Sequence, residues 1–149
     1  MKWLQTNPEN PWARYCCAWA FALDNQTSES IRFLDAIIKD TPTLIYAKFA
    51  LFFVNTLKGD KETALKYATE ELKQGAASID YFPLNMAWGY ALIDEKDEAV
   101  WWLNKSLDFG YSPYPLVLKF EIFHRVLKDH PGFHEYMKEI KKRSEEFVV

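Results

Sequence analysis

The stretch PWARYCCAWAFALD, residues 11–24, decides the fold, because its Trp12, Tyr15 and Trp19 are spaced like the turns of a helix. The same spacing returns 34 residues later at Tyr46, Phe49 and Phe53, and 35 residues after that at Tyr81, Leu84 and Trp88. Eight of these nine residues are aromatic, although aromatic residues make up only 17% of the chain. The pattern predicts a helical repeat that carries an aromatic stripe.

Composition narrows the class of protein. The chain has 149 residues, 49% of them hydrophobic, and a net charge of −3, which is typical of one folded domain. No apolar run is long enough to span a membrane and the N-terminus lacks a signal-peptide core, so we expect a cytoplasmic protein. The mixed charge argues against nucleic-acid binding, since Glu139, Glu145 and Glu146 dilute the basic cluster of the last helix, Lys138, Lys141, Lys142 and Arg143.

Turn-forming residues divide the chain into segments of helical length that are rich in Ala, Leu, Lys and Glu, without strand-like alternation. We expect helices over 11–24, 27–40, 43–58, 61–75, 80–93, 96–109, 114–128 and 131–147. The expected N-caps are Asp60, Asp97 or a neighbouring residue, and Thr27 or Ser28. Short connections at Asn25, Gly59 and Asp94 make neighbouring helices antiparallel, so the sequence predicts four helical hairpins that stack.

These residues resemble the tetratricopeptide repeat, a helix–turn–helix unit of 34 residues. Its small second-helix position is matched by Ser30, Ala64 and Ala99, and its late proline by Pro42. The Leu, small and Tyr positions of its first helix hold Cys17, Ala18 and Phe21, then Leu51, Phe52 and Asn55, then Met86, Ala87 and Tyr90. The chain departs from the family at the usual Trp position, which holds Arg14, Lys48 and Pro83. The resemblance implies an all-α, right-handed superhelical solenoid of antiparallel helix pairs.

The resemblance covers nearly the whole chain as a single domain, residues 1–149. It implies repeats at about 11–42, 43–76 and 79–110, a degenerate capping pair at 114–147, and residues 1–10 as the tail of a preceding helix. A weaker resemblance runs from Ala99, Trp101, Trp102 and Leu103 to Asp129, Pro131 and Phe133. This segment is similar to the closing part of repeat regions appended to bacterial cyclases and winged-helix regulators.

In such a solenoid the first helices line a concave face, and the aromatic stripe turns toward it. The predicted partner-binding residues are Trp12, Tyr15, Trp19, Tyr46, Phe49, Phe53, Tyr81, Asn85 and Trp88. Trp and Tyr suit a partner peptide or amphipathic helix with apolar anchors. Repeat domains that bind chaperones use Lys, Asn and Arg on this face to hold a carboxylate. Only Asn85 resembles that set here, so we do not predict that partner.

In a second interpretation, the residues of the aromatic stripe belong to the buried hydrophobic core. A register shift of two residues would bury Trp12, Tyr15, Cys16 and Trp19. The first helices are apolar on two faces, so a groove filled by the chain's own terminal helix or by a second copy is an expectation of equal weight to an open groove.

Residues with catalytic or metal-binding chemistry are few. His130 and His134 are four residues apart, but Pro131 and Gly132 lie between them and no third ligand is evident. Cys16 and Cys17 are adjacent and lack a neighbouring base, so we expect reduced structural thiols. We expect no metal, no cofactor and no enzymatic activity.

The sequence thus favours a non-enzymatic scaffold for protein–protein interaction. The alternative is a regulatory or sensor domain from a larger bacterial signalling protein, a cyclase or a transcriptional regulator. In that case the groove packs within the parent protein or forms a homodimer.

Overall fold

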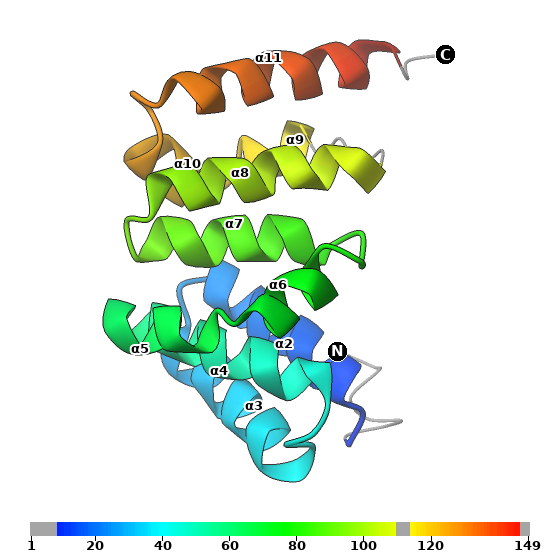
Figure 1. The fold of residues 1–149 in the computed structure, drawn as a ribbon, viewed down its shortest axis with the longest axis vertical. Coiled ribbons are helices and arrows are strands. Elements are labelled where there is room, and N and C mark those ends of the chain that lie inside the picture. Colours follow the sequence, from blue (N-terminus) through cyan, green and yellow to red (C-terminus); the bar gives the residue numbers. More distant parts are fainter. Residues whose placement is uncertain (1–8, 110–113, 147–149) are drawn as a thin grey trace. The chain divides into compact units, whose positions relative to one another are not determined.

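The computed structural model describes residues 9–109 and 114–146. Within these ranges every regular element is a helix, which confirms the predicted all-α class (Figure 1). The expected helices over 11–24, 27–40, 43–58, 80–93 and 131–147 correspond to α2 (Pro11–Leu23), α3 (Thr27–Asp40), α4 (Ile45–Lys58), α7 (Phe82–Leu92) and α11 (Pro131–Glu146). The expected helical tail lies largely in residues 1–8, outside the described residues.

Two expected helices are each broken in two. The segment 61–75 forms α5 (Lys61–Tyr67) and α6 (Glu70–Ala76), because the Thr69 hydroxyl accepts a hydrogen bond from the Leu72 N–H at 3.3 Å and starts a new helix. The segment 114–128 forms α9 (Tyr114–Val117) and α10 (Glu121–Val126). Between them the Phe120 N–H donates to the Val117 carbonyl, and this turn buries both side chains.

The expected helix over 96–109 ends earlier than the sequence predicts. It forms α8 (Lys96–Ser106) followed by the short 3₁₀ helix η1 (Leu107–Phe109). The buried Ser106 hydroxyl donates to the Leu103 carbonyl at 2.6 Å. Such a local bond competes with the regular helical pattern at this point.

The three tight connections share one turn geometry. Just past the end of each first helix one residue has a left-handed backbone, with φ of 58° at Asn25, 71° at Gly59 and 59° at Asp94. The next residue donates its N–H back over five residues in each turn: Gln26 to Phe21, Asp60 to Asn55, and Glu95 to Tyr90, at 2.8–2.9 Å. This is the Schellman arrangement, in which Gly, Asn and Asp are the residues that tolerate positive φ. The same turn therefore recurs 34 and then 35 residues further along.

The structure confirms only some of the N-caps that the sequence predicts. The Asp60 side chain accepts from the Thr63 N–H at 3.0 Å, which confirms this predicted N-cap. The prediction for Thr27 or Ser28 is wrong, because both lie inside α3 and the cap position is held by Gln26 without a side-chain bond. For the cap predicted at Asp97 or a neighbouring residue, Asp97 lies in the first turn of α8, and Glu95 holds the cap position without a side-chain hydrogen bond. The Asn10 side chain caps α2, accepting from Trp12 and Ala13, and this cap was missed.

The contacts of the chain define two compact units, residues 1–73 and 74–149, with the boundary inside α6. In the first unit α2 packs against α3 and α4, and α4 packs against α3 and α5. Buried residues of this unit include Leu34, Ile37, Phe49, Phe52 and Ala64. That both units belong to a single domain stays a prediction.

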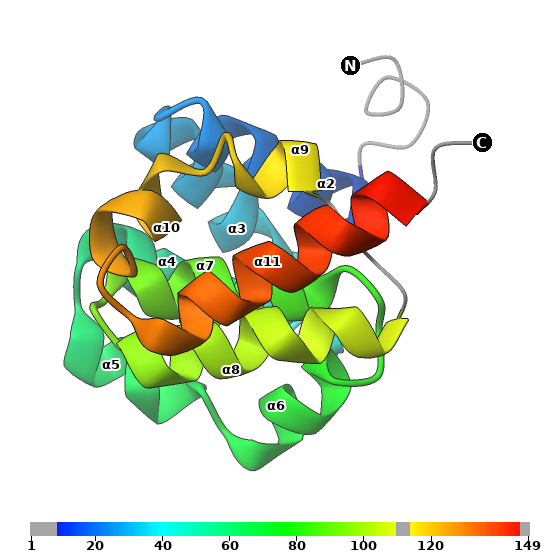
Figure 2. The same ribbon diagram turned by 90° about the horizontal axis from the view of Figure 1, so that it is seen from above.

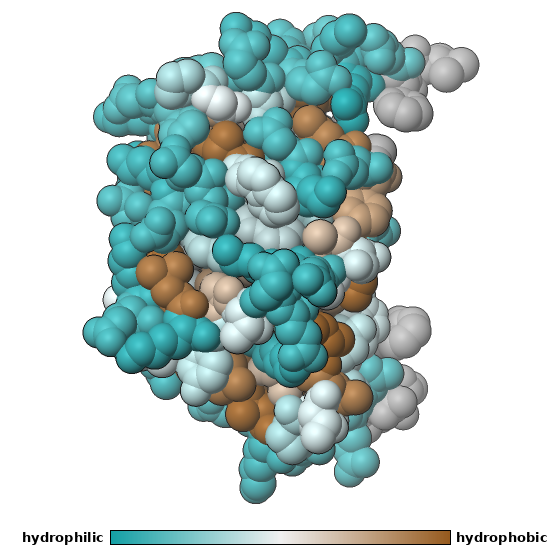
Figure 3. Space-filling model, viewed as in Figure 1, coloured by the Kyte–Doolittle hydropathy of each residue, from teal (hydrophilic) through white to brown (hydrophobic). Residues whose placement is uncertain are grey.

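In the second unit α7 packs against α8 and α10, and α11 packs against α8 and α9 (Figures 1 and 2). Its core contains Tyr90, Trp102, Phe123, Tyr136 and Ile140. The surface over α11, at the top of Figure 3, is mainly hydrophilic. The described parts of the chain contain no helix with the length and apolar character needed to cross a membrane.

Candidate partner-binding surface

An aromatic cluster joins α2 to α4, and Tyr15 lies at its centre. The Tyr15 ring centroid lies 6.1 Å from Trp12 and Phe53, and 6.2 Å from Tyr46 and Phe49. Tyr15 itself is only 2% exposed. Because aromatic rings attract one another at these separations, this residue stabilises the packing of α2 on α4.

The predicted stripe of the first unit divides into a buried inner part and a half-buried edge. Tyr15, Phe49 and Phe53 are buried. Trp12, Trp19 and Tyr46 are half-buried, and we call these three the aromatic rim. The rim rests on the buried part, since the ring of Trp12 lies 6.1 Å from Tyr15 and that of Trp19 lies 6.0 Å from Phe53.

The predicted residues of the second unit lie at or in α7. Tyr81 is half-buried before the first turn, with its ring 4.7 Å from Phe82. Asn85 and Trp88 are each only 6% exposed. Every residue from Phe82 to Ala91 is buried, so α7 is the central helix of its unit. Of the predicted residues, the rim and Tyr81 are therefore those with accessible side-chain surface.

Helix α2 buries residues that belong to both registers considered from the sequence, the tetratricopeptide register and the one shifted by two residues. Ala18, the small position of the tetratricopeptide pattern, is buried, and so is Tyr15 of the stripe. Cys16, which the shifted register would bury, is exposed. Phe52 occupies the small position of α4, yet it is fully buried and its ring lies 5.3 Å from Phe53. Phe52 thus belongs to the aromatic cluster, and its position in the repeat did not indicate this.

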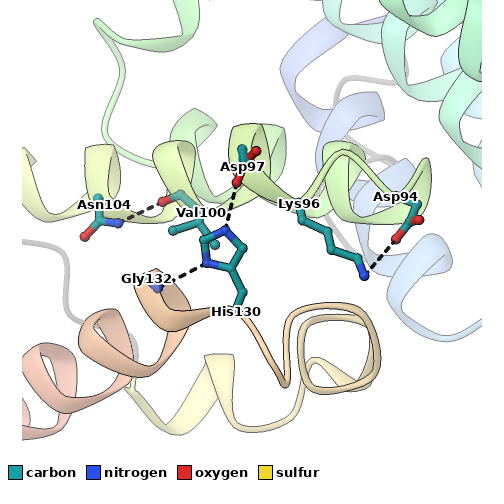
Figure 4. Close-up of polar contacts among 7 residues, drawn as sticks. All are labelled: Asp94, Lys96, Asp97, Val100, Asn104, His130 and Gly132. Carbon is teal, nitrogen blue, oxygen red and sulfur yellow. Dashed lines mark hydrogen bonds and ion pairs between the residues drawn. The ribbon is translucent and has the colours of Figure 1, made fainter.

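His130 connects the start of α11 to α8. Its Nε2 lies 2.9 Å from Asp97 Oδ1, and its Nδ1 accepts a hydrogen bond from the Gly132 N–H at 3.1 Å (Figure 4). Since Nδ1 is the acceptor, the neutral ring carries its proton on Nε2 and donates to Asp97. His134 is exposed on α11. Across residues 9–109 and 114–146, no three His, Cys, Asp or Glu side chains are grouped to hold a metal ion.

The adjacent cysteines are not activated. Cys16 is exposed by area, but neighbouring helix atoms partly desolvate its thiol and, with Cys17 beside it, raise its pKa to about 11. Partial burial also raises the pKa of Cys17. A thiol nucleophile reacts as the thiolate, so both residues are poorly reactive at neutral pH.

The basic cluster of α11 is paired with acidic residues of the same helix. Four pairs lie three or four residues apart: Lys138–Glu135 at 2.7 Å, Arg143–Glu139 at 2.6 Å, and Lys141–Glu145 and Lys142–Glu146 at 3.9 Å. Exposed pairs of this kind contribute little to stability. Arg143 also donates to the Leu107 carbonyl at 3.1 Å, which connects α11 to η1.

No protein-family model matches this chain, and neither a curated protein nor a solved structure matches it. The described fold defines an all-α protein built from helical hairpins with a recurring turn.

Proposed function

We propose that the chain is a non-enzymatic scaffold of the tetratricopeptide type that binds a peptide or helix of a partner protein. The recurrence of one turn geometry at Asn25, Gly59 and Asp94 is the observation that carries this proposal. It is supported by the small second-helix residues Ser30, Ala64 and Ala99, which are all buried as close helix packing requires.

In this proposal the hairpins stack as a right-handed superhelical solenoid. Stacking requires each first helix to pack against both helices of the preceding hairpin. In the first unit α4 does so, since it contacts both α2 and α3. Small-angle X-ray scattering of the full chain tests this stacking, because a solenoid and two independently moving units give different scattering curves.

The partner contacts the aromatic rim of the first unit. Half-buried Trp and Tyr side chains offer a large rigid contact area with a polar edge, and such residues are frequent centres of binding energy. The buried members, such as Tyr15 and Phe49, act indirectly by holding the rim in place. The partner is a segment with apolar anchors.

Affinity capture from a lysate of the source organism tests the rim. We expect Trp19→Ala to lose the proteins that the wild-type chain retains. Trp101→Ala is the matched control, because Trp101 is a 54% exposed tryptophan of α8 that lies outside the stripe. Circular dichroism of both variants shows whether helical content is kept.

Two outcomes contradict the proposal. Equal recovery of every captured protein by wild type and Trp19→Ala would exclude the rim as the binding surface. Loss of helical content in Trp19→Ala, with Trp101→Ala unchanged, would show that the rim belongs to the core.

A further inference from the structure

The first turn of α11 depends on the side chain of His130 for one of its hydrogen bonds. Pro131 has no N–H, and the N–H groups of Phe133 and His134 both donate to the His130 carbonyl, at 3.0 and 3.3 Å. The remaining N–H of this turn, that of Gly132, donates to His130 Nδ1 at 3.1 Å (Figure 4). A side-chain acceptor for such an N–H is an N-cap. The cap of α11 is therefore an imidazole, which can gain a proton.

Close packing holds the ring of His130 against this N–H. A Cβ added to Gly132 would lie 3.3 Å from both Cε1 and Nδ1 of the ring, and 2.8 Å from Val100 Cγ1. The absence of a side chain at Gly132 thus lets the ring and Val100 approach the backbone at the start of α11. The His130 side chain is 22% exposed, so the ring can exchange protons with water.

Asp97 of α8 is the charged group in contact with the ring. Its Oδ1 lies 2.9 Å from His130 Nε2, and its side chain is 99% exposed. Two further charged residues at the start of α8 act elsewhere. Lys96 pairs with Asp94 at 3.7 Å (Figure 4), and burial together with the charge of Glu98 raises the pKa of Tyr90.

The charged groups on the other nearby elements are paired or exposed. Glu135, in the second turn of α11, pairs with Lys138 at 2.7 Å. The ring of His124 in α10 lies 5.7 Å from that of Phe133. The exposed members of α10, of the turn before α11 and of its first turn are Glu121, Arg125, Lys128, Asp129 and His134.

Protonation has opposite effects on the two sides of the ring. The neutral ring donates from Nε2 and accepts at Nδ1, whereas the imidazolium ion donates from both nitrogens. The bond to Asp97 is therefore kept and becomes an ion pair. The bond from Gly132 is lost, because two N–H groups then face each other. The new positive charge also lies at the N-terminal end of α11, where the helix dipole is positive.

We infer that His130 is a pH-sensitive cap, which releases the first turn of α11 when its ring gains a proton in the mildly acidic range while the ring stays bound to Asp97. Phe133 follows Gly132 directly and is buried, so the cap acts on the turn that anchors α11 in the core. These residues belong to the second unit, and the inference does not depend on the aromatic rim.

Nuclear magnetic resonance of the isotope-labelled full chain tests this inference between about pH 8 and about pH 5. The nitrogen shifts of the His130 ring report its protonation. Hydrogen exchange of the Gly132 amide, corrected for the intrinsic effect of pH, reports the cap. We expect the protection of this amide to fall at least about fivefold, in step with protonation of the ring, as for the loss of an N-cap.

Three variants separate the cap from other effects of pH. In His130→Asn, the Asn side chain accepts without titrating, so Gly132 should stay protected at both ends of the pH range. His134→Asn is the matched control, since His134 is an exposed histidine of the same turn, and it should keep the wild-type response. Asp97→Asn removes the ion pair but leaves the cap, so protonation should still release Gly132.

Each of three results would overturn the inference. The first is constant protection of Gly132 while the ring of His130 gains its proton. The second is an equal response to pH in the wild type and in His130→Asn, which would assign the change to another group. The third is a ring that stays neutral down to about pH 5, because the cap would then not respond in the mildly acidic range.

Discussion

Replacing Tyr15 with alanine tests most directly how the aromatic stripe divides between core and surface. Tyr15 is 2% exposed and has four aromatic neighbours. Truncation of a buried aromatic side chain costs about 3–5 kcal/mol, which includes the lost ring contacts and the cavity left behind. We place Tyr15→Ala at about 4 kcal/mol, because its ring is surrounded on several sides. That is a large part of the roughly 5–15 kcal/mol by which domains are stable.

Guanidinium chloride unfolding, followed by far-UV circular dichroism, measures this loss as a lower midpoint. Trp12→Ala is the companion variant, because Trp12 is half-buried and belongs to the rim. Its expected cost is about 1–2 kcal/mol, since less apolar surface returns to water. If Tyr15→Ala lost less than about 1 kcal/mol with an unchanged denaturant slope, the assignment of Tyr15 to the core would be wrong.

Further predictions concern a turn, a close contact and a thiol. Gly59→Ala should cost about 1 kcal/mol in denaturant unfolding, because φ is +71° and no neighbouring atom lies within 4 Å, so only the backbone is strained. Gly59→Asn should cost less, and equal losses would contradict this. Gly132→Ala should lower the thermal midpoint, since the new Cβ would lie 2.8 Å from Val100 Cγ1. Val100→Ala should then recover part of the loss. In a Cys17→Ala variant, desolvation remains but the repulsion from Cys17 is gone, so the half-maximum of the alkylation rate of Cys16 should lie above the ordinary thiol pKa of 9.0 and below the value of about 11 in the wild-type chain. A half-maximum at 9.0 or lower would refute the raised pKa.

Hydrophobic spacing and turn residues were enough to predict five of the eight expected helices and three of the connections. Asn25, Gly59 and Asp94 mark the ends of first helices because few residue types tolerate a left-handed backbone. The break at Thr69 was missed, because a hydroxyl that caps a new helix looks the same in sequence as one within a helix. The break before Phe120 was missed as well, since it depends on which side chains the core of the second unit accommodates.

The candidate site was predicted less completely than the fold. The sequence indicated which residues form the stripe, but not that Tyr15 would be enclosed while Trp12 and Trp19 keep exposed surface. The bridge from His130 to Asp97 joins residues 33 positions apart in the chain. No local pattern marks such a contact.

The sequence by itself determined the all-α class, the period of the repeat and the identity of the aromatic stripe, because these depend on local spacing and on backbone preference. Only the tertiary structure decided which faces of the helices are covered. Cys16 and Ala50 hold the same position in the repeat, yet one is exposed and the other buried. Burial depends on whether another helix lies against a given face, and that is a property of the packed neighbours rather than of the helix itself.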